Sequence, residues 1–192
     1  KSCFERIGKI DTPVNDALSC DKVHRYRNKA QFPVRKDENN KAVTGFFAQR
    51  SHRIIPCSNC LLQPELLNEI AEFTVTRMNQ LGIKAYDEEK FTGLIRHIYM
   101  RYGEVSGQLM VCLVSTKKKV WNLDVLVKEL VEKYPMIETV VLNINDKNTN
   151  VILGEENVVL YGNGNISDVL CGVKITLSPH SFYQVNREGA EN

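Results

Sequence analysis

Apolar residues recur at helical spacing in two segments of the chain. In residues 64–82, PELLNEIAEFTVTRMNQLG, they repeat every three or four positions, with Pro64 suited to a first helical turn and Gly82 to a stop. Residues 122–135, NLDVLVKELVEKYP, show the same repeat, with Asn122 as the expected N-cap and Pro135 blocking continuation. The sequence therefore predicts two amphipathic helices.

Other segments are short, rich in β-branched and aromatic residues, and bounded by turn residues, which is typical of strands. They are YRNKAQFPV (26–34), AVTGFFAQ (42–49), LIRHIYMRYG (94–103), GQLMVCLVS (107–115) and TVVLNIN (139–145). With the first strand left out, the order of elements is β-α-β-β-α-β, as in ferredoxin-like folds. We therefore expect an α+β two-layer sandwich, in which two helices cover one face of an antiparallel sheet and the other face stays open.

The chain is expected to have three parts. Residues 1–25 form a lead-in, and residues 26–145 form a central α/β domain. Residues 146–192 are turn-rich around short strands and predict a β-hairpin extension and linker. The glycines of YGNGN (161–165) have the wrong spacing for a phosphate-binding loop and indicate a turn. Because the first residue is Lys1 and not Met, we expect processing or a longer polypeptide.

Composition favours a folded protein of the cytoplasm. The chain has 192 residues, and its 43% hydrophobic content is enough for a core. The longest apolar run, Leu109–Val114, is far too short to cross a membrane, and the polar start does not fit a signal peptide.

Charge is distributed unevenly. The net charge of +2 does not by itself indicate a nucleic-acid partner. Residues 22–53, however, are strongly basic. Their only acidic residues are Asp37 and Glu38, whereas their lysines and arginines are Lys22, Arg25, Arg27, Lys29, Arg35, Lys36, Lys41, Arg50 and Arg53. Both a solvated basic face and a phosphate-binding surface remain open for this segment.

The cysteines are expected to be reduced thiols, because no secretory signal is seen. Cys112 and Cys171 lie in apolar strand contexts and are interpreted as packing residues. Cys57 and Cys60 form CSNC, which is half of a tetrahedral zinc site without a second pair to complete it. His97 is expected to be structural and the TKKK segment (116–119) to be a solvated turn. No nucleophile–base or paired-carboxylate pattern can be argued from spacing, so the residues alone do not indicate catalysis.

Several segments together carry a family resemblance: YRNKAQFPV, TGFFAQRSHRIIPCSNCLLQ (44–63), LIRHIYMRYGEVSGQLMVCLV (94–114), TNVILGEENVVLYG (149–162) and SPHSFYQVN (178–186). In this order they resemble the central part of bacterial RNA (uracil-5-)-methyltransferases, most closely the 23S rRNA type. The resemblance implies an N-terminal OB-type RNA-binding domain before this segment and a Rossmann-like S-adenosylmethionine domain after it. The nucleophilic cysteine, the general base and the glycine-rich cofactor motif would then lie beyond Asn192, so no catalytic residue is expected here and the segment should be inactive alone.

The resemblance also implies roles for individual residues. Phe182 is expected against the target uracil and Gln184 near S-adenosylmethionine. From the basic segment we predict that Arg27 and Lys29 bind RNA, with rRNA favoured over tRNA. No membrane partner is expected, and the segment would dock on its own N- and C-terminal domains.

The same family commonly carries an iron–sulfur cluster held by four cysteines, and Cys57 matches the fourth ligand. Only Cys3 and Cys20 precede Cys57, and they lack the close spacing of the other ligands. The cluster is therefore expected, if at all, in the full-length protein, and no cofactor should be bound to this chain. An alternative function is a non-catalytic RNA-binding module that uses the basic segment and the open sheet face.

Overall fold

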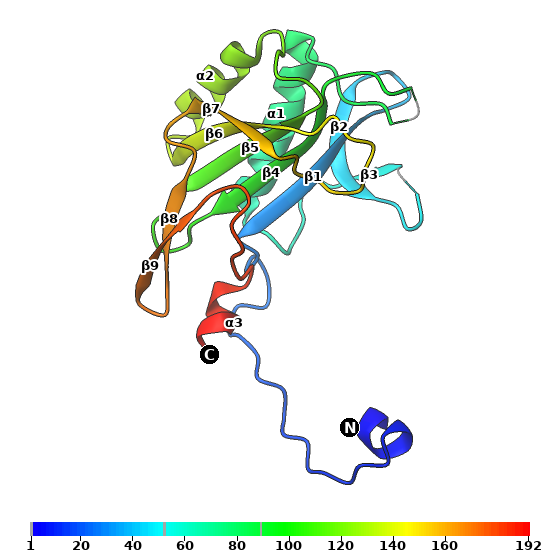
Figure 1. Cartoon of the computed structure of the whole chain (residues 1–192), viewed down its shortest axis with the longest axis vertical. Coiled ribbons are helices and arrows are strands. Elements are labelled where there is room, and N and C mark those ends of the chain that lie inside the picture. Colours follow the sequence, from blue (N-terminus) through cyan, green and yellow to red (C-terminus); the bar gives the residue numbers. More distant parts are fainter. Residues whose placement is uncertain (1, 52, 89) are drawn as a thin grey trace.

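The computed structural model describes residues 2–51, 53–88 and 90–192. After a short π-helix, Cys3–Ile7, an extended lead-in runs to the sheet, and the two termini lie toward the same end of the molecule (Figure 1). The strands and helices that follow are β1 (Lys29–Lys36), β2 (Ala42–Phe47), β3 (Ile54–Pro56), α1 (Glu65–Leu81), β4 (Ile95–Tyr102), β5 (Leu109–Ser115), α2 (Leu123–Lys133), β6 (Ile137–Ile144), β7 (Glu156–Tyr161), β8 (Ile166–Leu170), β9 (Val173–Leu177) and α3 (Arg187–Glu191). The expected α+β class is confirmed.

Within the described residues, seven strands form one sheet in the order β3-β2-β1-β4-β5-β6-β7, and β8 pairs only with β9. Neighbouring strands are antiparallel except β5 and β6, which are parallel and joined by α2. This order differs from the ferredoxin-like topology that we expected, in which another strand separates the parallel pair. The first strand also lies inside the sheet, between β2 and β4, and is not an addition to it.

A tight turn between β1 and β2 accounts for part of this difference. The backbone N–H of Asp37 donates to the carbonyl of Lys41 at 2.8 Å, and the Asp37 carboxylate accepts the N–H groups of Asn39 and Lys41. This hairpin commits residues 42–47 to pair with β1. The segment is therefore held away from β5, beside which a ferredoxin-like fold would need it.

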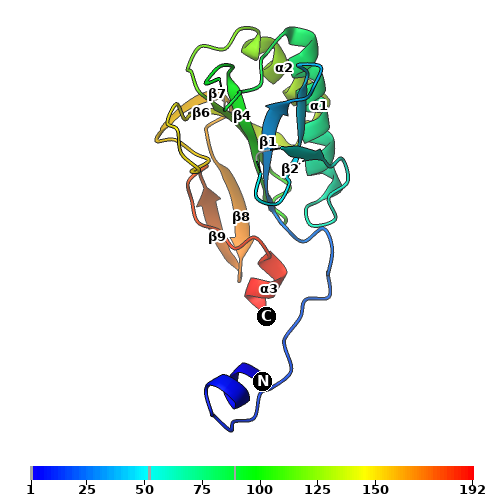
Figure 2. The same ribbon diagram turned by 90° about the vertical axis from the view of Figure 1, so that its right-hand side faces the viewer.

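Both predicted helices are present and cover the same face of the sheet (Figure 2). Their apolar faces and the facing strand residues form the main core, which includes Phe32, Leu67, Ile70, Leu113 and Leu126. Gly82 ends α1 in the left-handed conformation, as its position predicted. Asn122 precedes α2, but its side chain does not cap that helix and instead donates to the carbonyl of Leu81 at 2.9 Å.

The other face of the sheet is not open, contrary to our expectation. Ile152 and Leu153 pack on a cluster that includes Tyr99 and Cys112, while the β8–β9 hairpin brings Ile166 and Leu177 onto Met110. Figure 2 shows this hairpin on the side of the sheet opposite the helices. The face is covered because residues 146–183 fold back over the apolar side chains that point away from the helices.

Two further expectations concern single features. Cys112 is buried, and burial raises the pKa of its thiol to about 12, in agreement with a packing role. Cys171 is exposed in the turn between β8 and β9, so the prediction that it packs in the core was wrong.

Among the described helices, none combines the length and apolar character needed to cross a bilayer. The division into residues 1–25, 26–145 and 146–192 stays a prediction.

Candidate functional site

The SPHSFYQVN segment, residues 178–186, is here named the C-terminal strip. It follows β9 and crosses the face of the sheet opposite the helices before α3 begins. The Tyr99 hydroxyl donates to the carbonyl of Pro179 at 3.0 Å, and the Arg101 guanidinium donates to the carbonyls of Pro179 and Ser181. The strip is therefore held on β4 by side chains from the strand below it.

Side chains of the strip alternate between the sheet and the surface. Tyr183 points inward, is 7% exposed, and donates to the Asp168 carboxylate at 2.7 Å. Its neighbours Phe182 and Gln184 are exposed, Phe182 at 86%. An aromatic ring and a side-chain amide that can both donate and accept thus stand next to each other on a fixed backbone.

The two predicted RNA-binding cations flank the point where the strip meets β1. Arg27 forms an isolated bridge with Asn186, and between Arg27 and Lys29 lies Asn28, which bonds to the carbonyls of Gln184 and Val185. The structure therefore places the backbones of Arg27 and Lys29 beside the part of the strip that carries Gln184.

Lys29 also faces a further cation. It is the register partner of Arg101 on β4, and the Arg27 Nε donates to the Lys29 carbonyl at 3.1 Å. Partial burial, and after it the charges of Arg101 and Arg27, lowers the pKa of the Lys29 ammonium. Such a cluster of positive charge favours an anionic partner at this edge of the strip.

Two other cations of the basic segment, Arg25 and Arg35, have structural roles. Arg25 donates to the carbonyls of Cys60 and Gln63 at 2.6 and 3.2 Å. Arg35 is buried, donates to the carbonyl of Arg96 and forms an ion pair with Glu88. The strongly basic composition of residues 22–53 therefore overstates the positive surface available to a ligand.

Cys57 follows β3 and is half-buried, while the Cys60 thiol donates to the Gln63 side-chain oxygen at 3.2 Å. In residues 2–51, 53–88 and 90–192 no group of three or more His, Cys, Asp or Glu side chains is arranged to hold a metal. An iron–sulfur cluster of the expected type requires four thiolates. The described residues do not fit such a cluster, and the suggested iron–sulfur site gains no support.

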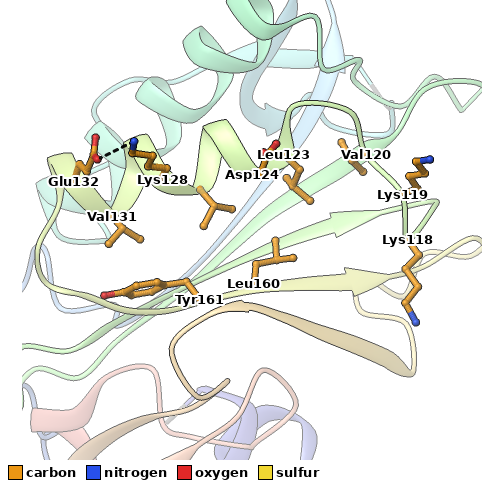
Figure 3. A pocket seen from close by; sticks show the side chains of 11 residues that line it. Lys118, Lys119, Val120, Leu123, Asp124, Lys128, Val131, Glu132, Leu160 and Tyr161 are labelled. Carbon is orange, nitrogen blue, oxygen red and sulfur yellow. Dashed lines mark ion pairs between the residues drawn. The ribbon is translucent and has the colours of Figure 1, made fainter.

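A cavity of about 680 Å³ lies elsewhere, between α2 and β7. Figure 3 shows Val131 and Leu123 of the α2 side facing Leu160 and Tyr161 of β7, with Lys118 and Lys119 at one end. Neither Phe182 nor Gln184 lines this cavity. Phe182 and Gln184 therefore lie on an exposed strip and not in this cavity.

The whole chain was compared with known proteins. No protein-family model matches the chain. An uncharacterized RNA methyltransferase of Streptococcus pyogenes is 40% identical over 190 residues, which cover 99% of this chain and 41% of that protein. The chain is similar to a segment of RNA methyltransferases.

Two more relatives have the same description. The Streptococcus mutans protein is 38% identical over 195 residues, covering 100% of this chain and 43% of that protein. The Oceanobacillus iheyensis protein is 38% identical over 185 residues, covering 95% and 40%. The chain thus spans about two fifths of the length of these RNA methyltransferases.

A solved structure shares the fold. It is the Pyrococcus abyssi tRNA (uracil-54, C5)-methyltransferase in complex with S-adenosyl-L-homocysteine, with a TM-score of 0.76 and 19% identity. The match covers 98% of this chain and 43% of that protein. Nearly the whole fold described above therefore occurs within that longer Pyrococcus abyssi protein.

Proposed function

We propose that this chain is the central, RNA-docking segment of a cytoplasmic S-adenosylmethionine-dependent RNA (uracil-5-)-methyltransferase that forms 5-methyluridine. The observation that carries the proposal is the C-terminal strip, which presents Phe182 and Gln184 outward beside Arg27 and Lys29. The similarity of nearly the whole chain to RNA methyltransferases supports it.

Each of these residues has chemistry suited to docking a flipped nucleotide. A base taken out of its stack can stack on an aromatic side chain, and the exposed ring of Phe182 is available for such stacking. The Gln184 amide can donate to and accept from a polar ligand, and the two cations can bind the RNA backbone. S-adenosylmethionine, when bound, supplies the methyl group, and Gln184 is the residue of this chain that would contact it. The nucleophile and the base belong to the rest of the proposed enzyme.

As substrate we propose 23S rRNA, because the quoted segments resemble that type of enzyme. Transfer RNA is the competing substrate, and the same experiment distinguishes the two. The alternative of a non-catalytic module is weakened, because the sheet face that it would use is covered by residues 146–183.

The test uses the full-length protein that carries this segment, S-adenosylmethionine, and rRNA or tRNA that lacks 5-methyluridine. Mass spectrometry of the digested RNA should show 5-methyluridine, more of it in 23S rRNA. Phe182→Ala should lower kcat/KM about 10- to 100-fold, because a stacked base loses about 1–3 kcal/mol. Trp121→Ala is the control, since Trp121 is also an exposed aromatic, at 78%, but precedes α2. Absence of 5-methyluridine from both RNAs would overturn the proposal.

A further inference from the structure

The outward segment of the strip is held on both sides of Phe182 and Gln184. On one side, Arg101 reaches from β4 to the carbonyls of Pro179 and Ser181, and the Tyr99 hydroxyl reaches the same Pro179 carbonyl. Arg101 is 5% exposed, and its ring contact with Tyr99 keeps the guanidinium 5.5 Å from the ring centroid. A guanidinium has several donors in a fixed plane, so it can set the spacing of two carbonyls at once.

On the other side, Asn28 holds two consecutive carbonyls. Its side-chain amide donates to the carbonyl of Gln184 at 2.9 Å, and its backbone N–H donates to the carbonyl of Val185 at 2.9 Å. Its own carbonyl accepts the N–H of Tyr102 at 2.9 Å, which ties this contact to β4. Asn28 is 2% exposed, so its amide is directed at the strip and not at solvent.

We propose that Asn28 and Arg101 are positioning residues that hold the strip so that Phe182 and Gln184 keep a fixed direction toward RNA and cofactor. This inference rests on the proposed function and adds to it two residues that touch neither ligand. Because Asn28 lies between Arg27 and Lys29, it also joins the RNA-binding cations to the backbone of the cofactor-binding Gln184.

The physical reason is the shortness of the outward segment. Phe182 and Gln184 are separated by one residue. The carbonyl of Ser181 accepts a bond from Arg101 of β4, and the carbonyl of Gln184 accepts one from Asn28, which directly precedes β1. Loss of either donor leaves a partly buried carbonyl without its bond, and the backbone must turn to find water. A pre-set backbone avoids that reorganisation when the ligand binds.

The test is a double-mutant cycle in the full-length protein. Asn28→Ala should raise the KM for S-adenosylmethionine about tenfold, because Gln184 loses its direction. In a Gln184→Ala background, the same change should leave this KM unaltered, since no amide remains to be positioned. An equal factor in both backgrounds would assign Asn28 to general stability and overturn the inference.

Asn145→Ala is the matched control. Asn145 is 1% exposed, and like Asn28 it holds two consecutive carbonyls, here with its side-chain amide: Val151 at 2.7 Å and Ile152 at 3.0 Å, in another loop. It should lower stability and leave the KM unchanged. Arg101→Lys tests the other side of the strip, because it keeps the positive charge but removes the planar guanidinium that donates to the carbonyls of Pro179 and Ser181. It should raise the KM for RNA in the wild-type background and not in Phe182→Ala.

Failure of the proposed function has a different signature. If Gln184→Ala and Phe182→Ala each keep the wild-type kcat and KM, the strip does not contact the ligands at all. If those two variants are impaired while Asn28→Ala and Arg101→Lys behave as the wild type, only the positioning roles are overturned.

Discussion

The Tyr183 hydroxyl donates a 2.7 Å hydrogen bond to the Asp168 carboxylate, and this contact ties the C-terminal strip to β8. Asp168 is 1% exposed and also accepts the backbone N–H groups of Glu104, Val105 and Ser106, which connect β4 to β5. Burial, and after it the bond to Asp168, raises the pKa of Tyr183. One carboxylate thus joins the strip, the hairpin and the sheet.

Tyr183→Phe should lower the free energy of unfolding by about 1.5 kcal/mol, because it removes a donor to a buried carboxylate while the ring keeps its packing. Urea unfolding of the 192-residue chain measures the change. Tyr161→Phe, on the exposed edge strand β7, is the control and should shift the midpoint little. Equal midpoints for Tyr183→Phe and the wild type would show that Asp168 is satisfied without the hydroxyl.

Local sequence patterns predicted where the main helices and strands lie. The order of the strands in the sheet was not predicted, because it depends on contacts between residues far apart in the sequence. The apolar repeats located α1 and α2 because a helix buries one side against a sheet. Strand order depends on which strands pair across the sheet, and the β1–β2 hairpin was not recognised as a central feature. Cys171 was misjudged because its apolar neighbours conceal a two-residue turn.

The residues of the candidate site were also predicted only in part. Phe182 and Gln184 were selected from a family resemblance, and the structure shows that both are exposed. Asn28 and Arg101 were missed because their partners are backbone carbonyls 156 and about 80 residues away along the chain. Backbone carbonyls have no sequence signal. The available warning was that β4 carries two arginines, Arg96 and Arg101, between apolar residues that belong to a core.

His97 should make stability depend on pH. Burial, and after it the charges of Arg35 and Arg96, lowers its pKa from 6.5 to about 3. The folded state keeps His97 neutral while the unfolded chain takes up a proton below pH 6.5, so stability is full above that pH and falls as the pH drops from 6.5 toward 3. The loss is at most about 1.4 kcal/mol per pH unit.

Replacing this side chain isolates its contribution. His97→Gln should remove roughly 1–2 kcal/mol of the difference in unfolding free energy between pH 6.5 and 5. Urea unfolding at several pH values gives this difference, and the exposed His24→Gln should retain the wild-type slope. Parallel pH profiles for the wild type and His97→Gln would contradict the assignment.

Cys57 should not support an iron–sulfur cluster in the 192-residue chain, because no suitable ligand group exists among the described residues. Reconstitution with iron and sulfide under anaerobic conditions should give substoichiometric iron. Cys57→Ser and the exposed Cys171→Ser should reduce that residual iron alike. Stoichiometric iron that is lost only in Cys57→Ser would show that a cluster site forms.

Charge reversal at Arg27 and Lys29 should weaken binding of the 192-residue chain to single-stranded RNA. Each cation that binds a phosphate releases counterions, so the double variant Arg27→Glu with Lys29→Glu should bind at least about tenfold more weakly at low salt, and its salt slope should fall by about 2. Fluorescence anisotropy of a labelled RNA across a salt series measures both quantities. The matched control, Lys117→Glu with Lys119→Glu, changes the net charge equally at an exposed turn. Equal losses in both double variants would mean that only net charge attracts RNA, whereas a loss confined to Arg27 and Lys29 identifies the edge of the strip as the RNA-binding surface.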